Sequence, residues 1–155
     1  MNHPKYDVIY KSEDDYIYDF VSRGKKGDIA KRIQFSETEF PLVYNLGFGD
    51  KTDHGIFDDT VNSNNGDRDK ILSTVVSAVY DFTDTYPERF VIFFGTNAVR
   101  TRLYRMAISL YLDELNKDFH IFAIKLSEDE LLTIPFEKDI LCDGFLVKKI
   151  KNNQL

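Results

Sequence analysis

The chain of 155 residues carries 20 basic and 26 acidic side chains, which gives a net charge of −6 at neutral pH. An acidic balance of this size argues against broad, non-specific binding to nucleic acid or to anionic membranes, although a local basic site is compatible with it. Hydrophobic residues make up 43% of the chain, so it can bury a core and is not a disordered sequence. The length favours a single domain over residues 1–155, with a frayed tail at 151–155.

Cysteine usage and hydropathy indicate the compartment. Cys142 is the only cysteine, which excludes an internal disulfide and a cysteine zinc cluster. The first seven residues lack the apolar segment of a signal peptide, and no apolar run approaches the roughly 18 residues that span a membrane. We therefore expect a cytoplasmic protein with no membrane partner.

The first third of the chain has the patterns of strands and turns. A short strand fits residues 6–10, and alternation of apolar and polar residues predicts a strand over 15–22. A Gly-rich turn at 23–28 joins it to a second alternating run at 29–35, which indicates a β-hairpin. The basic tip of this hairpin is either solvated or a binding loop. A third strand is predicted over 41–50.

A polar connection and a helix come next. Residues 50–67 form a loop that is long for a structureless connection, and such loops are commonly functional or mobile. Residues 68–86 place apolar side chains on one face, which predicts an amphipathic helix covering a sheet. Either Asn65 or Asp67 suits the N-cap of this helix, and Pro87 ends it.

A wholly apolar strand and a second helix follow. Residues 90–94 contain no polar side chain, as in a central strand covered on both faces. Residues 98–116 have the helical period, with two apolar stripes, so this helix is expected to be largely buried. We predict that it packs across the sheet through the first stripe, Val99, Leu103, Met106 and Leu110. The second stripe consists of Tyr104, Ile108, Tyr111 and Leu115.

The last third reads as strands with short connections. A strand is predicted over 119–126, a helical turn capped by Ser127 over 127–132, and an edge strand over 144–150, while 136–141 is ambiguous. The element order is ββ(β)–α–β–α–β–β. It predicts an α+β fold with a mixed sheet of about five to six strands and two main helices.

The strand–corner–helix unit around Gly95 is the strongest candidate for a site. A helix N-terminus presents free N–H groups and partial positive charge, so anions bind there. Arginine adds permanent charge and bidentate geometry for phosphate or carboxylate groups. Helical spacing directs Arg102 and Arg105 roughly the same way, and Arg100 toward the side of Tyr104. The candidate ligand-binding residues are Arg100, Arg102, Arg105, Asn97, Asn64 and Asn65.

A structural interpretation of the same residues is equally open. Cations at a helix start are unfavourable, so acidic side chains should compensate them. Salt bridges from the polar loop to the arginines would fold that loop onto the helix. The expected partners are Asp50, Asp58, Asp59 and Asp67.

Other chemistry has weaker signals. The acidic loop lacks the spacing of a calcium loop, so we expect no metal and no cofactor. His54 is the only reasonable general-base candidate, whereas His120 and Cys142 fit structural positions. The sequence contains no phosphate-binding GxxxxGK[ST] loop, no GxSxG motif and no HExxH motif. The catalytic residues, and whether the protein is an enzyme, stay open.

Three motifs carry a resemblance to a known family. They are Tyr44-Asn-Leu-Gly-Phe-Gly-Asp50, Asn62-Ser-Asn-Asn-Gly-Asp67 and Gly95-Thr-Asn-Ala-Val-Arg-Thr-Arg-Leu-Tyr-Arg105. With these motifs the chain resembles a family of small bacterial proteins of unknown function, over most of its length. The resemblance implies no activity and assigns no catalytic residue.

Two hypotheses of function follow. The first is a cytosolic module that binds a phosphate-bearing or otherwise anionic ligand, a nucleotide or a nucleic-acid end, at the strand–corner–helix unit. The alternative is a protein-interaction module of a toxin–antitoxin or mobile-element locus, without a small-molecule site. A homo-oligomer is compatible with both.

Overall fold

The computed structural model describes residues 3–57, 65–95 and 97–151. The chain divides into two compact units, each built from two segments. Unit 1 comprises Met1–Ser36 and Asn45–Thr85, and unit 2 comprises Glu37–Tyr44 and Tyr86–Leu155. The expectation of a single domain stays a prediction.

Unit 1 contains a hairpin-rich set of strands. They are β1 (Tyr10–Lys11), β2 (Ile17–Gly24), β3 (Gly27–Glu37), β4 (Val43–Thr52) and β5 (Gly55–Phe57). The last residue of β3 and the first two residues of β4 belong to unit 2. The pairs β1–β2, β2–β3 and β4–β5 are antiparallel. The predicted first hairpin is confirmed, since β2 and β3 pair from Ile17 to the turn between Gly24 and Gly27. Gly27 has a φ of 88°, a conformation that glycine adopts without strain.

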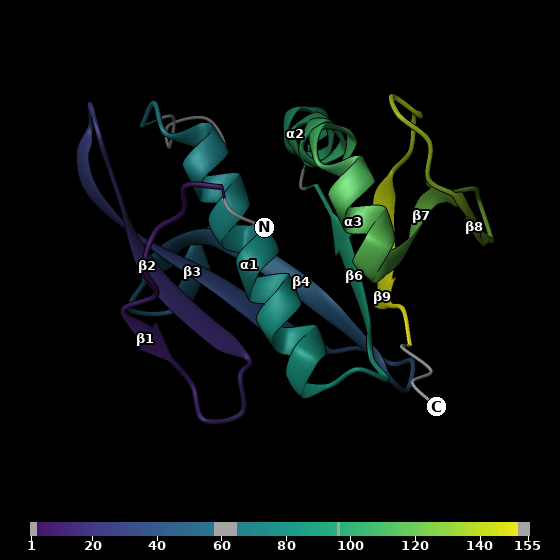
Figure 1. Ribbon diagram of the computed structural model, residues 1–155, viewed down its shortest axis with the longest axis horizontal. Coiled ribbons are helices and arrows are strands. Elements are labelled where there is room, and N and C mark those ends of the chain that lie inside the picture. The colour runs from purple at the N-terminus through teal and green to yellow at the C-terminus, as the bar shows by residue number, and fades with distance from the viewer. Residues whose placement is uncertain (1–2, 58–64, 96, 152–155) are drawn as a thin grey trace. The chain divides into compact units, whose positions relative to one another are not determined.

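One amphipathic helix, α1 (Arg68–Thr85), lies across the strands of unit 1 (Figure 1). Its apolar face includes Phe82, whose ring stacks on Phe35 of β3 with 4.1 Å between centroids. Phe20 of β2 is also fully buried. The predicted helix over 68–86 is therefore confirmed, and its apolar side chains form the core with the alternate residues of β2 and β3.

Unit 2 combines four strands with two helices (Figure 1). They are β6 (Phe90–Phe94), α2 (Ala98–Leu110), α3 (Leu112–Asp118), β7 (Phe119–Leu126), β8 (Leu131–Pro135) and β9 (Gly144–Lys149). The strand order is β6–β9–β7–β8, and each of these pairs is antiparallel. Although β9 comes last in sequence, it lies between β6 and β7, so it is an inner strand of this unit.

The predicted strand β6 over 90–94 is present. It pairs with β9 along its whole length, and Phe90 N–H donates to the carbonyl of Leu42 at 2.7 Å. Val91 and Phe93 are buried, whereas the other three residues of β6 are half-buried. The apolar sequence predicted a strand that is buried on both faces, whereas only one face of β6 is fully buried.

The α+β class is confirmed, but the predicted number of strands is wrong. The described residues form nine strands instead of about five to six. The predicted helical turn over 127–132 is also wrong, because Ser127 N–H donates to the carbonyl of Glu130 at 2.9 Å in the turn of the β7–β8 hairpin. Leu131 pairs with Leu126 across this hairpin, and cross-strand pairing outweighs a local preference for helix.

The predicted helix over 98–116 is interrupted at Tyr111, where the backbone has φ −104° and ψ 15°. The prediction that it packs through Val99, Leu103, Met106 and Leu110 is wrong. Val99, Met106 and Leu110 are 63%, 40% and 68% exposed, and Leu103 is half-buried. The opposite stripe is buried instead. The ring of Tyr104 contacts Phe93 edge-on at 5.4 Å, and an aromatic side chain buries more area than an aliphatic one.

One buried amide, Asn65, ties the β2–β3 turn to the start of α1. Its Oδ1 accepts the N–H of Lys26 at 2.6 Å, and its Nδ2 donates to the carbonyl of Gly27 at 2.8 Å. Nδ2 also donates to Ser22 Oγ at 3.1 Å. A Cβ at Gly24 would lie 1.9 Å from the carbonyl oxygen of Asn65, so only glycine fits there. The β2–β3 turn therefore depends both on the hydrogen bonds of Asn65 and on the absence of a side chain at Gly24.

The two stripes of α2 can be distinguished by stability. Ile108→Ala should lower the free energy of unfolding by about 2–5 kcal/mol, because Ile108 is buried. Leu110→Ala removes a mostly exposed side chain and should change it by less than about 0.5 kcal/mol. Urea denaturation of both variants measures the difference, and equal losses would contradict the assignment of the core face.

The role of Asn65 can be tested in the same way. Asn65→Ala should lower the free energy of unfolding by roughly 2–4 kcal/mol, since it removes three hydrogen bonds, of which the one to Ser22 is buried and the other two are part-buried. Asn116→Ala is the matched control, because Asn116 is exposed on α3. A loss for Asn65→Ala no larger than that of the control would show that the amide does not hold the turn.

Candidate functional site

The corner between β6 and α2 is closely packed. A Cβ at Gly95 would lie 2.2 Å from the backbone N of Thr101, so a larger residue would force the helix away. Asn97 is the N-cap, and its Oδ1 accepts the N–H of Arg100 at 2.9 Å. Its carbonyl accepts the N–H of Thr101 at 3.0 Å. The predicted ligand residue Asn97 thus already serves the helix start with its side chain.

The three arginines of α2 have different environments. Arg100 is only 8% exposed and shares the buried face with Tyr104. Arg102 is exposed, and Arg105 is half-buried. The first turn of α2 contains no acidic residue, so the positive partial charge of the helix end is not offset within the helix. Arg102 is therefore the arginine best placed to meet an external ligand.

The charge of Arg105 influences the pKa of Cys142, the only thiol in the sequence. Burial raises the pKa of Cys142, and the nearby charge of Arg105 lowers that pKa only in part. The thiol therefore stays protonated at neutral pH, which makes it a poor nucleophile. This agrees with a structural position for Cys142.

Of the predicted loop residues, those that the structure describes are Asn65, Asp50 and Asp67, all in unit 1. Asp67 accepts the Ser22 hydroxyl at 2.5 Å and also accepts the hydroxyl of Tyr6. Burial, followed by the hydrogen bond to Asp67, raises the pKa of the Tyr6 hydroxyl, so that hydroxyl keeps its proton. Asp50 forms an ion pair with Lys31. Asn64, Asp58 and Asp59 lie outside the described residues, and the pairing of the loop with the arginines stays a prediction.

A buried ion pair on the β2–β3 hairpin was not foreseen from the sequence. Asp19 is 2% exposed and accepts two hydrogen bonds from Arg32, at 2.8 and 3.0 Å. Lys51 lies 3.2 Å from the same carboxylate. Burial would raise the pKa of Asp19, but Arg32 and Lys51 outweigh it and hold the pKa below its usual value. The carboxylate is thus saturated by cations and is a structural element rather than a general base.

The described residues contain neither a cluster of metal-binding side chains nor a helix that could cross a membrane. Over residues 3–57, 65–95 and 97–151, no group of three or more His, Cys, Asp or Glu side chains could hold a metal ion. His54 lies exposed in the β4–β5 turn, and His120 is exposed on β7. Among the described helices, none has the length and hydropathy needed to cross a bilayer.

Comparison with known proteins gives a family and no activity. No curated protein and no solved structure matches the chain. The model of a family of unknown function, DUF6934, matches residues 2–150, in agreement with the resemblance to a family without an assigned activity. Because the match covers nearly the whole sequence, the chain belongs to the DUF6934 family.

Proposed function

We propose that the protein is an interaction module whose helix α2 binds an acidic amphipathic segment of a partner protein. The observation that carries this proposal is the exposure of Val99, Met106 and Leu110 at 63%, 40% and 68%. Single exposed apolar residues are common, but these three share one helix face with the half-buried Leu103. An apolar face that its own unit does not cover is typical of a binding surface.

Charge defines the complementary partner. The helix contains three arginines and no aspartate or glutamate, although the whole protein has a net charge of −6. Arg102 lies one turn from Val99 and from Met106, so a permanent cation borders the apolar stripe. A partner helix with apolar anchors at matching spacing and carboxylates at its margin would satisfy both features.

A second copy of α2 fits less well than an acidic partner. Two such helices would bring several arginines together without any carboxylate of their own, and like charges across an interface are unfavourable. A heterologous partner avoids this repulsion. A toxin–antitoxin or mobile-element locus is one setting for such a module, and it stays a prediction.

The interaction can be tested with an idealised helical peptide that carries a leucine stripe bordered by glutamates. Fluorescence anisotropy should detect binding to the protein, and Leu110→Ser should weaken it by at least about tenfold, the effect expected for losing an apolar anchor. Leu141→Ser is the matched control, because Leu141 is 74% exposed and lies outside α2. Equal weakening by both substitutions would contradict the proposal.

The charge preference is tested by a second peptide with lysines in place of the glutamates. The basic peptide should bind much more weakly than the acidic one, and the difference should shrink as salt is raised. Equal affinity for the two peptides would remove the argument for an acidic partner.

Anion binding at the β6–α2 corner is the second candidate. It is favoured by the exposure of Arg102 beside a helix start that contains no acidic residue. This candidate differs from the first in needing Arg102 and the helix end but not Leu110.

Thermal denaturation with nucleotides and short oligonucleotides tests the corner. If it binds such anions, they should raise the melting temperature of the wild type, and Arg102→Ala should abolish that rise. The substitution itself should change stability by no more than about 0.5 kcal/mol, since Arg102 is exposed. Lys117→Ala, which removes an exposed cation of α3, is the control. Failure of every anion to stabilise the wild type would rule out this candidate.

A further inference from the structure

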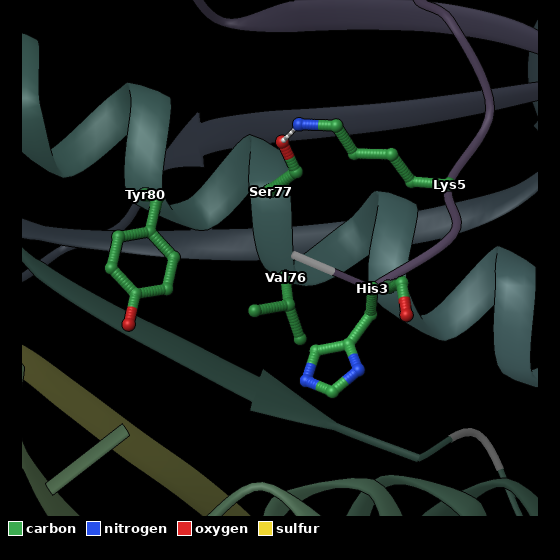
Figure 2. A pocket seen from close by; sticks show the side chains of 6 residues that line it. His3, Lys5, Val76, Ser77 and Tyr80 are labelled. Atoms are coloured by element: carbon green, nitrogen blue, oxygen red, sulfur yellow. Dashed lines mark hydrogen bonds between the residues drawn. The ribbon is translucent and has the colours of Figure 1, made fainter. Parts of the chain in front are cut away.

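A small pocket in unit 1 lies between the N-terminal segment and α1. Figure 2 shows the side chains of His3 and Tyr80 on either side of Val76, with Lys5 joined to Ser77 by a hydrogen bond. The sixth lining residue is Ser73, and the cavity has a volume of about 180 Å³. None of the six lining residues belongs to α2, so this proposal does not depend on the proposed interaction surface.

The N-terminal segment is fixed in place by Tyr6. Its N–H donates to Thr74 Oγ1 at 2.9 Å, and its hydroxyl donates to Asp67. Lys70 places its ammonium 4.3 Å from the centre of the Tyr6 ring, which adds a cation–π contact. The segment that carries His3 and Lys5 therefore does not have to be ordered by a ligand, and a preformed pocket loses less entropy on binding.

The lining of the pocket has the chemistry of an anion site. It contains one ammonium, one imidazole and three hydroxyls, and none of its six residues is acidic. Lys5 Nζ donates to Ser77 Oγ at 3.1 Å in an exposed contact, and a lysine ammonium has three N–H donors, so two further donors of Lys5 can reach a ligand beside Ser77.

Size limits the ligand. Pockets for drug-sized molecules occupy about 300–1,000 Å³, and one water takes up about 30 Å³ of liquid. A cavity of about 180 Å³ therefore suits a single small group. We propose that this pocket binds the phosphate group of a small molecule, with Lys5 supplying the charge and Ser77 a hydroxyl.

Isothermal titration calorimetry with inorganic phosphate and with glycerol phosphate tests the proposal. The wild type should bind at least one of them saturably, which also shows whether the group is recognised free or as a monoester. Lys5→Met keeps the length of the side chain but removes its charge, and it should weaken binding by at least about tenfold, as for loss of a charge-assisted hydrogen bond. Ser77→Ala should weaken binding as well.

Lys138→Met is the matched control, because it removes one exposed lysine from unit 2 and changes the net charge equally. It should leave the affinity unchanged. The proposal is overturned if neither phosphate compound binds the wild type, or if Lys138→Met weakens binding as much as Lys5→Met. Circular dichroism of Lys5→Met and Ser77→Ala establishes that both are folded, and retained phosphate affinity in folded Ser77→Ala and Lys5→Met would equally overturn it.

Discussion

The geometry of unit 1 depends on the hydrogen bonds of one buried amide. Asn65 Oδ1 accepts the N–H of Lys26, and its Nδ2 donates to Ser22 and to Gly27. Two residues later, the carbonyl of Asp67, just before α1, accepts the N–H of Ile71. A buried amide is stabilising only when its polar atoms are satisfied, so the turn and the helix must approach in one arrangement. Asp67 then receives the Tyr6 hydroxyl, which places the N-terminal segment along α1. The pocket that Lys5 and Ser77 line is a consequence of this sequence of contacts.

The same contacts favour a structural role over a ligand-binding role for the polar motif that ends at Asp67. A cluster of asparagine, glycine and aspartate beside a helix start is compatible with ligand binding, and the side chains of Asn65 and Asp67 are used in structural bonds instead. The arginines of α2 lack an acidic residue within their own helix, and Arg102 is exposed. A motif rich in polar residues is thus weaker evidence for a site than a charge left at the surface of a helix.

Local patterns predicted the β2–β3 hairpin, α1 and β6, because alternation and helical period depend only on neighbouring residues. The buried face of α2 could not be predicted in this way. Both of its stripes are apolar. The stripe that is buried includes Tyr104, whose ring contacts Phe93 and Phe145 on strands that are distant in sequence. The pair Asp19–Arg32 depends on strand register, and the pocket depends on where the N-terminal segment lies. Neither is visible in a local pattern.

Two surfaces with different chemistry follow from this arrangement. The α2 surface combines exposed apolar side chains with arginine. The pocket of His3, Lys5 and Ser77 offers hydroxyls and an ammonium in a small volume. An extended partner would be bound at the first surface through apolar area and long-range attraction, whereas a small anion would be bound in the second through short hydrogen bonds.

Because hydrophobic association depends weakly on salt and a charged contact depends strongly on it, ionic strength separates the contributions of Leu110 and Arg102 at the first surface. A partner that used only the arginines would lose its affinity in salt, and the exposed stripe of α2 would then need another explanation.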